Sequence, residues 1–150
     1  MKHSAAVAVA LAFTLTACGS GEGGESADPV LAALKSDPMG TREPEGFTLV
    51  DSHGTPREER GVATGKPTQA SWVRDFRSTA EADDSTAVLD HLAQASQRGG
   101  WEVGYSGPSD LSATKTIDGE PAVLYVSIEP ASPESIAGAE EYSLQISLRS

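Results

Sequence analysis

The sequence DDSTAVLDHLAQASQRGGWEVGY, residues 83–105, decides the fold because a helical repeat stops abruptly and leads into a strand. Apolar residues recur there at the spacing of one helix face, at Val88, Leu89, Leu92 and Ala95. Gly99-Gly100 ends the pattern, since glycine readily adopts the left-handed conformation found at helix C-termini. We therefore expect one main helix over residues 85–98 and a strand over residues 101–105.

Short extended segments surround this helix. At the C-terminus, Tyr142, Leu144, Ile146 and Leu148 alternate with polar residues, which indicates a strand with one buried and one wet face. Asp118-Gly119, a dipeptide favoured in tight hairpins, separates two further strands. The expected strands cover residues 47–50, 70–78, 101–105, 111–117, 122–128 and 142–148.

The order of these elements predicts the fold class. Two strands precede the helix and four follow it, and the last three are spaced as an antiparallel meander. We expect an α+β domain of two layers, with one main amphipathic helix packed on a mostly antiparallel sheet of about five or six strands. A short helix over residues 28–35 should begin at Asp28-Pro29, and residues 51–69, rich in Gly, Pro and charge, should form a long loop.

The first residues have the composition of a targeting segment. Met1-Lys2-His3 is basic, and residues 5–17 are uncharged and mostly apolar. This run is shorter than the roughly 20 residues that a transmembrane helix needs. We expect residues 1–17 to be a signal peptide, residues 18–27 a flexible Gly/Ser/Glu tether, and residues 28–150 a single globular domain.

Leu15-Thr16-Ala17-Cys18 resembles the lipobox of bacterial lipoproteins. The resemblance implies cleavage before Cys18, a diacylglycerol on its thiol, and an extracytoplasmic domain anchored to the cell membrane by palmitate-type acyl chains. The alternative is an ordinary secretory signal that contains a cysteine. Farther along, Gly100-Trp101 and the later hairpin resemble small secreted lipoprotein domains, a resemblance that implies no function.

Charge and cysteine content exclude several classes of partner. Beyond residue 17 the chain has 10 basic and 22 acidic residues, a formal charge of −12. Such a charge argues against binding nucleic acid and against electrostatic attraction to anionic lipid. Because Cys18 is the only cysteine, its acylation would leave no thiol for a disulfide, a metal site or catalysis.

Side chains of catalytic type are scattered along the sequence: Ser52, His53, His91, Ser112 and Lys115. Ser52 and His53 are neighbours on an expected strand, so they should point to opposite faces. Ser112 and Lys115 match an S-x-x-K motif, but its partner motifs S-D-N and K-T-G are absent from the chain. His91 has no second ligand at helical spacing.

The acidic residues Glu81, Asp83 and Asp84 lack the spacing of a calcium loop, and stabilisation of a helix N-terminus explains them. From these patterns we expect no enzymatic activity, no cofactor and no stoichiometric metal.

A candidate partner surface is carried by Trp72, Arg74 and Phe76, which share one face of an expected strand. If that face is core, Arg74 must reach the sheet edge or pair with a carboxylate, and we favour this interpretation. If the face is open, the three residues form an aromatic and cationic surface. Arg57 and Arg60, in the charged segment 57–60, are further candidates for partner contact.

These observations favour a membrane-anchored envelope lipoprotein whose domain is non-enzymatic and binds an unknown envelope protein in an interaction or accessory role. The alternative is a small-ligand carrier with an apolar cavity between helix and sheet. A cavity in that place would favour the carrier, whereas a filled core and an exposed apolar patch would favour partner binding.

Overall fold

The computed structural model describes residues 28–58, 68–78, 84–130 and 142–150. The expected signal peptide and tether, residues 1–27, lie outside this part of the chain. The described elements are α1 (Pro29–Ser36), β1 (Phe47–Thr55), β2 (Ser71–Ser78), α2 (Ser85–Arg98), β3 (Glu102–Ser106), β4 (Asp110–Ile117), β5 (Glu120–Pro130) and β6 (Tyr142–Arg149). None of the described helices has the length and apolarity needed to cross a bilayer.

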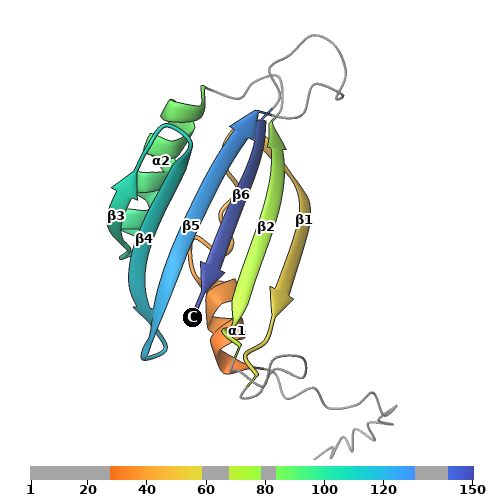
Figure 1. The fold of residues 1–150 in the computed structure, drawn as a ribbon, viewed down its shortest axis with the longest axis vertical. Coiled ribbons are helices and arrows are strands. Elements are labelled where there is room, and N and C mark those ends of the chain that lie inside the picture. The colour runs from red at the N-terminus through yellow and green to blue at the C-terminus, as the bar shows by residue number, and fades with distance from the viewer. Residues whose placement is uncertain (1–27, 59–67, 79–83, 131–141) are drawn as a thin grey trace, which may run out of the picture.

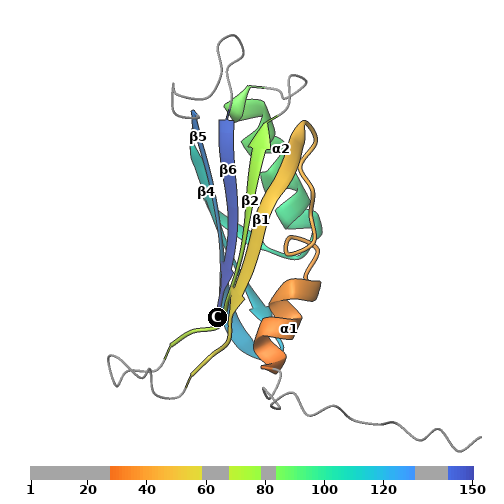
Figure 2. The same ribbon diagram turned by 90° about the vertical axis from the view of Figure 1, so that its right-hand side faces the viewer.

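The six strands form one sheet in the order β1-β2-β6-β5-β4-β3, and each neighbouring pair is antiparallel (Figure 1). Strands β3 to β6 are a meander, and β6 joins it to the β1–β2 pair. The connection that contains α2 crosses from β2 to the far edge at β3. Both helices lie on the same face of the sheet, so the fold is α+β with a covered face and an open face (Figure 2).

The helices begin and end where their capping residues are. The side chain of Asp28 accepts from Val30 N at the start of α1, and that of Asp84 accepts from Ala87 N at the start of α2. The Asp28 carboxylate also accepts from the backbone N–H of Arg57, and this bond is the main reason why the pKa of Asp28 lies below its ordinary value. At the end of α2, Gly100 has a φ of 82°, which permits the turn into β3.

Strand β6 has the predicted register. Leu144, Ile146 and Leu148 are fully buried against the helices, whereas Ser143 is exposed on the other face. Ser147 differs from the prediction, because it lies on the open face and yet is buried. Its hydroxyl has no hydrogen-bond partner.

The prediction of a long loop over residues 51–69 is wrong for residues 51–55, because β1 continues to Thr55. Residues 51–55 pair with residues 71–75 of β2, after an irregularity between Leu49 and Asp51. As the edge strand of the sheet, β1 is exposed along most of its length, so its second half can be as polar as a loop. Hydrophobic patterning therefore does not mark this part of the strand.

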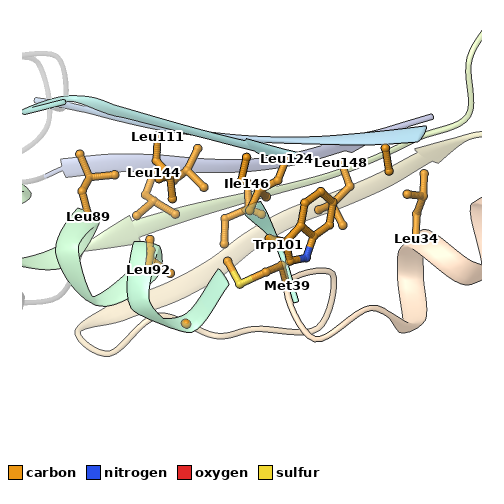
Figure 3. Close-up of a cluster of buried hydrophobic side chains, with 14 of the residues drawn as sticks. Leu34, Met39, Leu89, Leu92, Trp101, Leu111, Leu124, Leu144, Ile146 and Leu148 are labelled. Carbon is orange, nitrogen blue, oxygen red and sulfur yellow. The ribbon is translucent and has the colours of Figure 1, made fainter. Parts of the chain in front are cut away.

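The covered face of the sheet and the two helices enclose the hydrophobic core. Side chains from α1, α2, the segment around Met39 and five of the strands form one continuous buried cluster, and the partly buried Val103 of β3 packs against it. Figure 3 shows Leu34 of α1 and Leu89 and Leu92 of α2 directed at the leucines and Ile146 of the sheet. Side chains thus occupy the layer between the helices and the sheet.

Candidate functional site

The structure separates the residues of catalytic type. Ser52 pairs with Arg74 and faces the helices, whereas His53 pairs with Val73 and lies on the open face, so the predicted opposition of these two neighbours is confirmed. His91 is exposed on α2, on the helix side of the sheet.

Ser112 shares the open face with His53, but it lies four strands away. The register between them runs through His53, Val73, Ser147, Tyr125 and Ser112. With about 4.8 Å between neighbouring strands, the two backbones are roughly 19 Å apart. A nucleophile and its base must lie about 2.6–3.2 Å apart, so these residues do not form a catalytic pair.

Lys115 belongs to a polar cluster inside the covered face. Its Nζ donates to Asp37 Oδ2 and to the carbonyl of Gly99, both at 2.7 Å. The buried Asp37 carboxylate also accepts from Trp101 Nε1 at 3.0 Å and from Met39 N at 2.8 Å. The cluster therefore ties the end of α1 and the end of α2 to β4. Sequence reasoning missed this role of Asp37, because its side-chain partners Trp101 and Lys115 are 64 and 78 positions away.

Trp72, Arg74 and Phe76 share a strand face as predicted, and that face is the covered one. Arg74 and Phe76 are 6% and 1% exposed, and Trp72 is partly buried. Arg74 Nη1 donates to the carbonyl of Arg42 at 2.6 Å, and its Nη2 lies 3.8 Å from a Glu43 carboxylate oxygen. Arg74 thus pairs with a carboxylate, as expected for a core position. An open aromatic and cationic surface through these residues is not supported by their burial.

The other two proposed partner residues lie in the segment that follows β1. Arg57 is exposed, and its Nη1 lies 3.4 Å from Glu120 Oε1. This pair connects the end of the β1 segment with the start of β5. Arg60 lies outside the described residues, as do Glu81 and Asp83 of the acidic run.

Three groups that could bind a cation meet on the open face. Ligand atoms of Asp51, His53 and Asp75 all lie within 4.8 Å of one another. Asp51 and Asp75 are opposite each other in register, and Asp75 Oδ1 accepts from Gln145 Nε2 at 2.9 Å. Asp51 and His53 are exposed, so water competes for each ligand position. Among the described residues this set offers three protein ligands, and our expectation of no stoichiometric metal stays a prediction.

The open face carries most of the exposed large apolar side chains of the described chain. Tyr105 of β3 and Val123 and Tyr125 of β5 are each about half exposed, at 53%, 48% and 45%. Tyr105 and Tyr125 both pair with Ser112, so the two rings flank the same position of β4. Figure 2 shows no helix on this side of the sheet. The open face therefore exposes two tyrosine rings and a valine on a side of the sheet that neither α1 nor α2 covers.

Farther along β5 from Tyr125, the open face has an acidic hollow of about 220 Å³. Asp75, Ser127, Glu129, Ser143 and Gln145 line it, and they come from β2, β5 and β6. Two carboxylates above a floor of hydroxyl and amide groups suit a basic group. This hollow and the three exposed apolar residues are the features that set the open face apart from the helical side.

Comparisons of the chain with protein-family models, with curated proteins and with solved structures find no match.

Proposed function

We propose that the protein is a membrane-anchored envelope lipoprotein whose domain docks a basic segment of another envelope protein on the open face of its sheet. In this proposal Cys18 carries the lipid, residues 18–27 are the tether, and α2 is the main amphipathic helix that covers the opposite face. The domain acts as a binding or accessory module and performs no chemistry itself.

The observation that carries the docking proposal is the combination of exposed tyrosines with an acidic hollow on the open face. Tyrosine is enriched in protein interfaces because its ring is apolar and its hydroxyl can hydrogen-bond. Asp75 and Glu129 line the hollow, which shares strand β5 with Tyr125, and the chain as a whole is acidic. Charge complementarity thus favours a partner segment that carries Lys or Arg.

The carrier alternative has less support. It needs an apolar cavity between helix and sheet, and this layer is occupied by leucine, isoleucine, valine and aromatic side chains that are almost fully buried. The filled layer and the exposed apolar residues on the open face together favour partner binding.

The lipid anchor is tested by Cys18→Ala. We expect this variant to take up no clickable palmitate and to leave the membrane fraction or remain an unprocessed precursor, because Cys18 is the only acyl acceptor of the lipobox type. Metabolic labelling of intact cells, followed by fractionation, measures both effects. Label on the Cys18→Ala protein would show that the lipobox assignment is wrong.

The docking face is tested by a photo-crosslinking phenylalanine analogue placed at Tyr125 in the full chain. We expect it to capture one envelope protein through a peptide that contains Lys or Arg, as read by mass spectrometry. The same analogue at Gln94, exposed on α2, is the matched position on the other side and should not capture that protein.

Charge variants test whether the acidic hollow contributes to this docking. Asp75→Asn and Glu129→Gln should each lower the crosslink yield roughly two- to fivefold, as expected for exposed charge pairs. Asp90→Asn on α2 removes the same charge from the helical side and should have no effect. Equal capture from Tyr125 and Gln94, or yields unchanged in both acidic-hollow variants, would rule out the open face as the docking site.

A further inference from the structure

A second hollow lies on the other side of the molecule, between α2 and the segment that follows α1. Its volume is about 220 Å³, and it is lined by Arg42, Glu45, Val88, His91, Leu92 and Arg98. Val88 and Leu92 are buried and give it an apolar floor. The open-face proposal does not use this hollow.

This hollow is lined mostly by basic side chains, although the chain as a whole is acidic. Two guanidinium groups and one imidazole line it, with a single carboxylate from Glu45. Within the described part of the chain, the side chains of Arg42 and Arg98 have no ion pair and no hydrogen bond. In a chain with twice as many acidic as basic residues, two such guanidinium groups at one hollow are available to a ligand.

The wall that carries Arg42 is held in place from inside the fold. Arg74 Nη1 donates to the Arg42 carbonyl, and Trp72 Nε1 donates to the Gly40 carbonyl at 2.9 Å. Phe47 N closes a turn on the carbonyl of Pro44. The opposite wall is α2, whose buried residues pack on the sheet. Both walls are therefore ordered before a ligand arrives, which lowers the entropy cost of binding.

We propose that this hollow binds a small phosphate ester, with the phosphate between Arg42 and Arg98 and its apolar group on Val88 and Leu92. Guanidinium groups match phosphate oxygens with two parallel hydrogen bonds each. His91 supplies a further donor, which suits a group with three terminal oxygens. The Glu45 carboxylate repels anions, so it disfavours a ligand that has a second anionic group beside its phosphate. It favours a ligand that offers it a hydroxyl. The phosphate is that of a soluble ester or of a lipid headgroup.

The probe is phenyl phosphate, titrated calorimetrically into the full chain in an uncharged detergent. We expect saturable one-to-one binding that is weakened roughly tenfold or more by Arg42→Gln and by Arg98→Gln. Glu45→Gln should bind phenyl phosphate more tightly than the parent, because it removes the repelling charge. If these residues only stabilised the fold, all three variants would bind more weakly. Arg77→Gln, on the open face, is the matched control and should bind as the parent does.

The source of the phosphate is decided with the lipid-anchored protein in phosphatidylcholine nanodiscs, with and without phosphatidic acid. Weaker phenyl phosphate binding in the presence of phosphatidic acid identifies a headgroup as the ligand, and unchanged binding identifies a soluble ester. Only this arm depends on the proposed lipid anchor. No binding of phenyl phosphate in detergent, or equal binding by the parent, Arg42→Gln and Arg98→Gln, would overturn the proposal.

Discussion

Asp37→Ala should destabilise the domain by about 2–5 kcal/mol, because it leaves two buried N–H donors without an acceptor and unpairs the partly buried Lys115. The carboxylate accepts three hydrogen bonds, from Lys115 Nζ, Trp101 Nε1 and Met39 N. The indole of Trp101 and the backbone of Met39 lie in buried positions, so neither donor can turn to water when Asp37 is lost. Each unsatisfied donor costs about 1–3 kcal/mol. Urea unfolding followed by tryptophan fluorescence measures the effect.

Two further variants separate charge from hydrogen bonding in this cluster. Asp37→Asn retains an acceptor oxygen and should cost less than Asp37→Ala. Lys115→Met leaves the buried carboxylate with its two N–H donors, and a double-mutant cycle with Asp37→Ala gives the coupling between the partners. Asp90→Ala, exposed on α2, should change stability by no more than about 0.5 kcal/mol. A loss below about 1 kcal/mol in Asp37→Ala would show that the cluster is not a stabilising junction.

Leu144→Ala and Ile146→Ala should each lower the free energy of unfolding by about 2–5 kcal/mol, which combines lost burial with the cavity left behind. Both residues have no exposed surface and lie in β6, which is hydrogen-bonded on both sides, to β2 and to β5. Figure 3 shows both side chains directed at the helical layer. The position in the middle of the sheet limits how far the surroundings can relax, so values in the upper half of that range are expected.

The control for these core variants is Ser143→Ala in the same strand. Ser143 is exposed on the open face, so its substitution should change stability by no more than about 0.5 kcal/mol. Thermal unfolding at matched protein concentration gives all three values. If Ser143→Ala and Leu144→Ala lowered the free energy of unfolding by similar amounts, the assignment of a buried and an exposed face to β6 would be wrong.

Several elements could be predicted because their signals are local. The helix over residues 85–98 follows from a periodic apolar face with Asp84 before it and glycines after it, and these interactions span at most five positions. The Asp118-Gly119 hairpin follows from two residues that tolerate positive φ, observed at 52° and 83°. The alternation in β6 indicated its buried face before any partner strand was known.

Other features depend on contacts between distant parts of the chain. Strand order is one, since β6 lies between β2 and β5 and no local pattern specifies that neighbour. The second half of β1 is another, because these exposed residues are held in a strand by hydrogen bonds to β2 and not by burial of their side chains. The role of Arg74 was open between two alternatives until the segment around Arg42 was seen to cover it. The lipobox assignment remains a prediction, as it rests on residues outside the described structure.

The sequence by itself determined the helices, the hairpin and the buried face of the last strand, because hydrophobic periodicity, capping and turn chemistry act between near neighbours. Only the tertiary structure decided which polar residues meet. The pairing of Asp37 with Lys115, the aromatic and acidic open face, and the two arginines at one hollow each join residues more than 20 positions apart. Such contacts form only when chain folding brings separate elements together, and the candidate binding sites on the described residues are of that kind.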